Sequence, residues 1–163
     1  MRNTRSCFHA SVLLVPLLAA ACGKGSVAPG DYTAVQCGQG TSQSRAAEIG
    51  QQGGTVSVAD HSLIVPPEAL NGRVPFTITE IPGGYLGVEL GPDGTRFARN
   101  ATLRLSFARC GGNPAGFSNL RVVQVERGTA RIIRVLPSTV DTQARTVTTT
   151  GLDHLSGYLI SGT

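Results

Sequence analysis

The chain contains no tryptophan, and aromatic side chains make up only 5% of its 163 residues. Sugar faces usually stack on aromatic platforms, so this shortage disfavours a carbohydrate-binding module. Carboxylates paired at a recognisable spacing are also missing, which disfavours a hydrolase. A carbohydrate- or polymer-binding module therefore stays open only as an alternative.

The excess of basic over acidic residues is also small. The formal net charge is +4, Lys24 is the only lysine, and no run of basic residues is present. A nucleic-acid-binding surface needs a clustered basic footprint. We therefore expect no nucleic-acid partner.

Residues that hold metals or cofactors are few. The chain has three histidines and four cysteines, and the cysteines show no metal-ligand spacing. His61 follows Asp60 in a predicted turn, where a solvated histidine is expected rather than a ligand. We expect no metal site and no cofactor.

The first 22 residues change in character from the N-terminus onward. Arg2 and Arg5 precede an uncharged stretch that closes with the small residues 19–21 and Cys22. This layout resembles the signal peptide and lipobox of bacterial lipoproteins. The resemblance implies that residues 1–21 are removed, that Cys22 carries acyl chains and that the protein is anchored in the cell envelope. Gly23, in place of aspartate, favours the outer membrane in a Gram-negative cell.

Two cysteines remain once this segment is assigned. Cys7 lies in the part to be removed and Cys22 is the lipidation site, which leaves Cys37 and Cys110. An even pair in an oxidising compartment predicts a Cys37–Cys110 disulfide. Two unpaired thiols are the alternative.

The next segment is poor in bulky apolar side chains. Residues 22–52 are rich in Gly, Ser, Gln and Ala, which predicts a flexible tether after the lipid. The stretch Ser42–Gln52 has some helical propensity, yet Gly50, Gly53 and Gly54 end it. We expect coil or one short turn there.

From Gly53 the hydrophobic pattern alternates with a period of two. Short runs of this kind are separated by turn residues, among them the Pro66-Pro67 stop and the Arg127-Gly128 link of a predicted hairpin. No ten-residue segment after Gly53 has helical periodicity. The pattern predicts an all-β domain over residues 53–163, an antiparallel sandwich of about eight or nine strands.

Three segments of this domain resemble the ZU5 family. They are the opening Gly53–Val56 with Leu63–Leu70, the segment Leu90–Phe97, and the ending His154–Tyr158. The resemblance covers roughly residues 53–160. It implies a ZU5-like sandwich that acts as an interaction module or mechanical link, and not as an enzyme.

The ending also resembles sites at which some ZU5-containing and adhesion-receptor proteins cut their own backbone. At such sites a serine hydroxyl, here that of Ser156, attacks the preceding carbonyl carbon, and His154 would serve as the base. The acyl group shifts from the backbone nitrogen to the serine oxygen, and water then hydrolyses the ester. The alternative is that His154 and Ser156 only satisfy hydrogen bonds in a turn. We expect the structural role and keep cleavage between Leu155 and Ser156 as the alternative function.

A binding surface is harder to locate from sequence. Arg121, Arg131 and Arg134 fall on the predicted central hairpin and would form a basic row for an acidic polymer, or else a solvated outer face. Tyr85 follows Gly83-Gly84 in a predicted exposed turn. These are the expected contacts with an unidentified envelope protein or polymer, in addition to the membrane that Cys22 enters.

Overall fold

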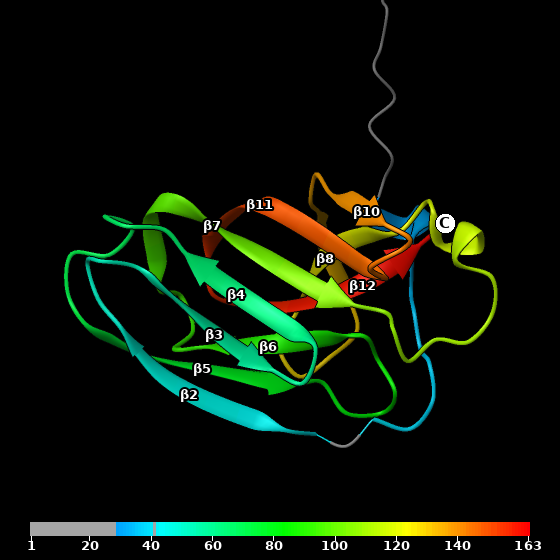
Figure 1. Cartoon of the computed structure of the whole chain (residues 1–163), viewed down its shortest axis with the longest axis horizontal. Helices are drawn as coiled ribbons and strands as arrows, with labels where there is room; N and C mark the ends of the chain where they lie inside the picture. Colours follow the sequence, from blue (N-terminus) through cyan, green and yellow to red (C-terminus); the bar gives the residue numbers. More distant parts are fainter. Residues whose placement is uncertain (1–28, 41) are drawn as a thin grey trace, which may run out of the picture.

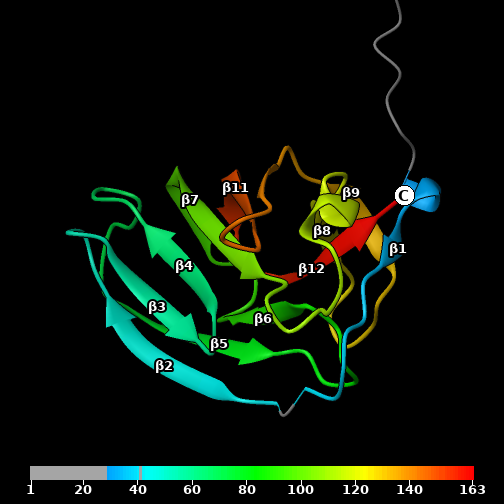
Figure 2. The same ribbon diagram turned by 45° about the vertical axis from the view of Figure 1, so that its right-hand side comes forward.

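The computed structural model describes residues 29–40 and 42–163. Within these residues the chain forms two antiparallel β-sheets packed face to face (Figures 1 and 2). Two short 3₁₀ helices, η1 (Pro29–Asp31) and η2 (Pro114–Phe117), lie outside the sheets. No helix in the described part of the chain has the length and hydrophobicity needed to span a bilayer.

The seven-stranded sheet has the order β2-β5-β6-β12-β8-β9, with β1 paired to the end of β12. Its strands are β1 (Thr33–Ala34), β2 (Ser44–Ile49), β5 (Val74–Glu80), β6 (Gly87–Gly91), β8 (Arg121–Val125), β9 (Ile132–Val135) and β12 (Gly157–Gly162).

The five-stranded sheet has the order β10-β11-β7-β4-β3. Its strands are β3 (Gly54–Val58), β4 (His61–Val65), β7 (Arg96–Ser106), β10 (Thr139–Asp141) and β11 (Thr146–His154).

The predicted all-β sandwich is therefore confirmed, although the described residues contain more strands than expected. Ten strands follow Gly53, and β1 and β2 precede it. The expectation of coil over Ser42–Gln52 is wrong. All six residues of β2 pair with β5, from Ser44 opposite Thr79 to Ile49 opposite Val74. Tertiary pairing overrides the weak helical propensity of this segment, as it commonly does.

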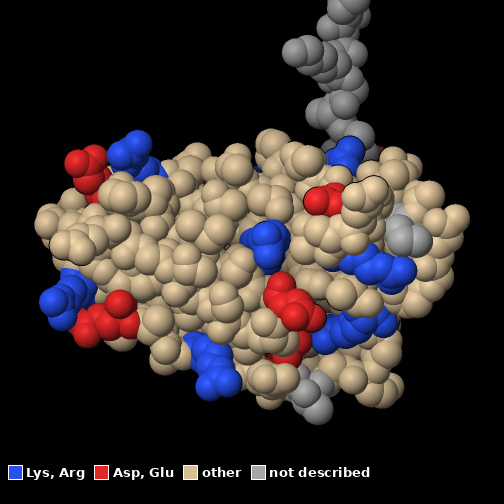
Figure 3. All heavy atoms as spheres, viewed as in Figure 1, with Lys and Arg blue, Asp and Glu red and all other residues tan. Residues whose placement is uncertain are grey.

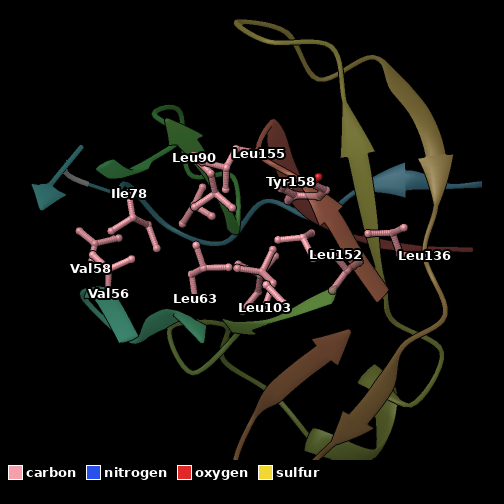
Figure 4. Packing of buried hydrophobic residues seen from close by; sticks show 14 of the residues in the cluster. Val56, Val58, Leu63, Ile78, Leu90, Leu103, Leu136, Leu152, Leu155 and Tyr158 are labelled. Atoms are coloured by element: carbon pink, nitrogen blue, oxygen red, sulfur yellow. The ribbon is translucent and has the colours of Figure 1, made fainter. Parts of the chain in front are cut away.

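The core lies between the two sheets, where the period-two patterns place one face of each strand. Side chains from both sheets meet there, as Figure 4 shows for Leu63 and Leu103 on one side and Ile78 and Leu90 on the other. These four are fully buried. The apolar residues at every second position thus determine which face of each strand points inward and how the two sheets pack on each other.

Both ends of the described chain lie at one end of the sandwich. Thr33 and Ala34 pair with Gly162 and Ser161, so β1 runs beside the C-terminal strand (Figure 2). The hydroxyl of Ser161 also donates a hydrogen bond to the carbonyl of Thr33, at 2.7 Å. The segment that leads back toward Cys22 is therefore fixed to this end of the domain.

Candidate functional site

The predicted disulfide between Cys37 and Cys110 is present in the structure. The Cys37–Cys110 disulfide connects the segment after β1 to the loop after β7, with 5.0 Å between the Cα atoms. Residues 1–21 and Cys22 lie outside the described residues. Signal cleavage and lipidation therefore stay predictions.

Leu155 and Ser156, the predicted cleavage point, form the crossover between the sheets. β11 ends at His154 in one sheet and β12 begins at Gly157 in the other. Backbone hydrogen bonds hold the crossover: the N–H of Leu155 donates to Thr95, and the carbonyls of Leu155 and Ser156 accept from Gly94 and Leu90. Both crossover residues are buried.

A polar cluster surrounds His154 at this crossover. The side-chain amide nitrogen of Gln124, on β8, lies 3.0 Å from Nε2 of His154 and 3.4 Å from Oγ of Ser156. Asp153 accepts from Nδ1 of His154 at 2.7 Å and from Arg134 at 3.0 Å. His154 and Ser156 thus lie close together, but each contacts the amide of Gln124, and no direct hydrogen bond joins the two side chains.

Hydrogen bonding assigns the roles of the ring nitrogens. Since Asp153 can only accept, Nδ1 of His154 carries the proton and Nε2 accepts from the amide of Gln124. The hydrogen bond from Arg134 is the main cause that lowers the pKa of Asp153, to about 2, and the bond from His154 adds to it. The nitrogen that would serve as base is therefore occupied by Gln124 and not by Ser156.

Tyr158 supports the same corner from the core. Its hydroxyl donates to the carbonyl of His154 at 2.8 Å, and its ring is fully buried (Figure 4). Burial raises the pKa of Tyr158 well above its usual range, so the hydroxyl remains a neutral donor.

The predicted basic row does not form. Arg134 lies opposite Gln124 in the β8–β9 register and pairs with Asp153, whereas Arg121 stands three residues from Gln124 and so faces the other side of β8. Arg131 lies between the strands and pairs with Glu126 at 2.8 Å. On the face in Figure 3, basic and acidic groups are interspersed and neither sign dominates.

Tyr85 is placed differently from the expectation. The turn is not freely exposed, because Gly84 is buried and Tyr85 is half-buried against the cluster of Val123, Val125 and Leu159. Tyr85 lines a surface groove of about 520 Å³ whose other residues come from the η1–β1 segment and the β8–β9 link. They include Tyr32, Arg131 and Ile132. Two of the predicted binding residues, Tyr85 and Arg131, therefore share one concave surface.

His61 also differs from its expected place in a solvated turn. It is the first residue of β4 and only 3% exposed, and its Nδ1 accepts a hydrogen bond from the backbone N–H of Ser106. The alternation His61, Leu63, Val65 already places this side chain on the inner face. The same alternation, Phe76, Ile78, Glu80, points to the buried Glu80 on β5.

Sequence reasoning missed the residues that complete these sites. Gln124 carried a weak signal, because it alternates with the apolar Val122 on the inner face of β8. Tyr32 carried none, since it lies in the segment interpreted as a tether. Among the residues that the structure describes, no three His, Cys, Asp or Glu side chains are placed to hold a metal ion.

No family model matches this chain, and a search of curated proteins finds no significantly similar sequence. The resemblance to lipoproteins and to ZU5 domains therefore stays a prediction from the residues quoted above.

Proposed function

We propose that this protein is an exported lipoprotein, anchored through acyl chains on Cys22, whose ZU5-like sandwich is a non-enzymatic binding or structural module of the cell envelope. The groove of Tyr32, Tyr85 and Arg131 is its contact with an envelope partner. The observation that carries the proposal is the shared location of Tyr85 and Arg131 on this groove.

The place of the groove fits an anchored protein. Its wall includes Thr33 and Ala34 of β1, and Thr33 follows Cys22 by eleven residues. Even fully extended, eleven residues reach at most about 40 Å. A lipid on Cys22 would hold the groove within that distance of the membrane, so its partner is expected within the same reach.

The groove also has the composition of a contact surface. Tyrosines combine a large apolar body with a polar tip, and tyrosine and arginine are enriched at protein interfaces. Tyr32 and Tyr85 are half-buried, which leaves part of each ring open to a partner. Since Arg131 already pairs with Glu126, the surface favours a protein partner of mixed charge over a strongly acidic polymer.

Site-specific photocrosslinking in native cells tests the groove. A photoreactive phenylalanine analogue replaces Tyr85 or Tyr32, and Ile64, which is exposed on β4 of the other sheet, serves as the matched control. We expect one dominant envelope protein to be captured from positions 85 and 32 and not from 64. Equal capture from all three positions, or capture from none, would argue against the groove as the contact.

The anchor is tested separately. Labelled palmitate should be incorporated into the wild-type protein and not into Cys22→Ala, and the variant should leave the membrane fraction. A Cys22→Ala protein that stays membrane-bound would overturn the anchor while leaving the groove experiment valid.

Self-cleavage at Leu155–Ser156 has less support. Ser156 Oγ is 3.4 Å from the amide of Gln124, and that amide occupies Nε2 of His154. We expect the intact mass to end at Thr163 under native conditions. A chain that ends at Leu155 would instead establish the autoproteolytic alternative.

A further inference from the structure

A second polar cavity lies away from the groove and the His154 cluster. Its volume is about 200 Å³, and it lies where the β3–β4 turn, the end of β5 and the end of β7 meet. The polar side chains that line it include His61, Glu80, Arg109, Asp60, Gln39 and Gln43.

A hydrogen bond from the backbone determines which nitrogen of His61 carries the proton and can donate it. Nδ1 accepts from the N–H of Ser106 at 3.0 Å, so the proton of the neutral ring sits on Nε2. Burial, and then the charge of Arg109, lower the pKa of His61 to about 4, which keeps the ring neutral. Nε2 makes no hydrogen bond to any residue that the structure describes, and the nearest carboxylate oxygen is 3.8 Å away on Glu80.

Glu80 supplies the complementary acceptor. Its side chain is only 5% exposed and forms an ion pair with Arg109 at 3.2 Å. An N–H donor thus faces a carboxylate across the cavity, and the 3.8 Å gap between them is too long for a direct hydrogen bond. Both groups line the cavity, and Nε2 is not sealed from solvent, so one molecule in the cavity can bond to both.

The chemistry of the lining selects among ligands. A metal ion needs a lone pair on Nε2, but that nitrogen carries the proton. An anion would meet Glu80 and Asp60, whereas a simple ammonium ion offers no acceptor to the N–H of His61. A hydroxyl group satisfies both partners, because it accepts from His61 and donates to Glu80.

We propose that this cavity binds a small neutral polyol or sugar ring by its hydroxyl edge, without the aromatic stacking whose scarcity disfavours an ordinary carbohydrate-binding module. One hydroxyl lies between His61 and Glu80 and the next against Arg109 and Asp60. The cavity volume of about 200 Å³ suits a ligand of about one ring. With so few contacts the dissociation constant is about millimolar. This site shares no lining residue with the groove, although Arg109 also donates a hydrogen bond to the backbone carbonyl of Tyr85. Its test uses neither the groove nor the anchor, so its failure and theirs are distinguishable.

Nuclear magnetic resonance of the full-length protein, in a detergent without a sugar headgroup, tests the proposal. The probes are methyl α-D-glucopyranoside, methyl β-D-galactopyranoside and glycerol, and tetrahydropyran is the ring without hydroxyls. At least one polyol should shift the amide signals of Asp60 and Ser106 in a saturable way. Tetrahydropyran should leave them unchanged.

Glu80→Gln removes the negative charge and replaces one of the two carboxylate oxygens by an NH₂ donor, which should weaken binding at least about tenfold. Glu48→Gln is the matched control, since Glu48 is an exposed carboxylate that pairs with Arg73 elsewhere on the surface. If Glu80→Gln fails to fold, nuclear Overhauser contacts between the His61 ring and the sugar protons of the wild-type complex decide instead.

Three outcomes would overturn the assignment. They are no saturable shift with any polyol, equal binding by wild-type protein and a folded Glu80→Gln variant, and binding of acetamide without any polyol. The last result would assign the site to carboxamides, which also offer one acceptor and one donor.

Discussion

The amide nitrogen of Gln124 lies 3.0 Å from Nε2 of His154 and so joins a strand of the seven-stranded sheet to the last residue of β11 in the other sheet. This contact fixes the crossover at which the chain passes between the layers. It also removes the free nitrogen lone pair that self-cleavage would need.

The Gln124–His154 contact should be measurable as a coupling energy. Gln124→Ala leaves Nε2 of the partly buried His154 and Oγ of the buried Ser156 without their donor. We expect a loss of about 1–2 kcal/mol in the free energy of unfolding. A double-mutant cycle with His154→Ala, followed by urea denaturation, should give a coupling of about 1 kcal/mol. Additive effects would show that the contact contributes no stability.

The pKa of Asp153 should depend on Arg134. Arg134→Met removes the main cause of the low pKa, which should rise from about 2 toward its ordinary value of 3.8. Because the folded pKa is depressed, the stability that Asp153 contributes is present above pH 3.8 and is lost as pH falls through 2. Carboxyl carbon titration measures the change. Arg131→Met, which disturbs only the exposed pair with Glu126, should leave Asp153 unaffected.

His61 predicts a second acid dependence at higher pH. The groups that face it are Asp60, Glu80 and Arg109. Its folded pKa of about 4 lies below the ordinary value of 6.5, so the unfolded chain binds more protons between these values and stability falls as pH falls through this window. The full effect is about 3 kcal/mol. Denaturation at stepped pH should show this slope in wild-type protein, and His61→Gln should lack it. An equal slope in both proteins would contradict the assignment.

The disulfide should contribute substantially to stability. In the chain-entropy model, a crosslink between residues 73 apart stabilises the fold by about 4 kcal/mol. Replacing both Cys37 and Cys110 by serine should lower the denaturation midpoint accordingly. Reduction of wild-type protein should reproduce the loss, and a smaller effect in both experiments would indicate that the crosslink restricts the unfolded chain little.

Gly87 should tolerate no side chain. A Cβ atom there would lie 2.2 Å from the carbonyl oxygen of Tyr158 on the neighbouring strand β12. Gly87→Ala is expected to cost about 3 kcal/mol or to prevent folding. Gly116→Ala is the control, because a Cβ atom at that position meets no atom within 4 Å. Thermal melting compares the two, and similar melting temperatures would contradict the close approach of the strands.

The sandwich could be predicted because most strands bury one face and expose the other. In β7, for example, the buried Leu103 and Leu105 alternate with polar residues, which shows in the sequence which face is buried. β2 was missed because its one strongly buried residue, Ile49, cannot show a period. Its place comes from pairing with β5, which no local pattern encodes. The motif around His154 was found locally, whereas Gln124, thirty residues earlier, reaches it only through the β8–β12 pairing.

If the protein is held by its N-terminus, as proposed, the disulfide has a mechanical consequence. A pulling force applied before Thr33 would be transmitted from Cys37 through the disulfide to Cys110, so the residues between them cannot be extended while the bond is intact. At roughly 3.5 Å per residue, the disulfide keeps about 250 Å of chain from being extended. Strands β2 to β7 are thereby shielded from pulling, and β1 with its contact to β12 is the part that yields first.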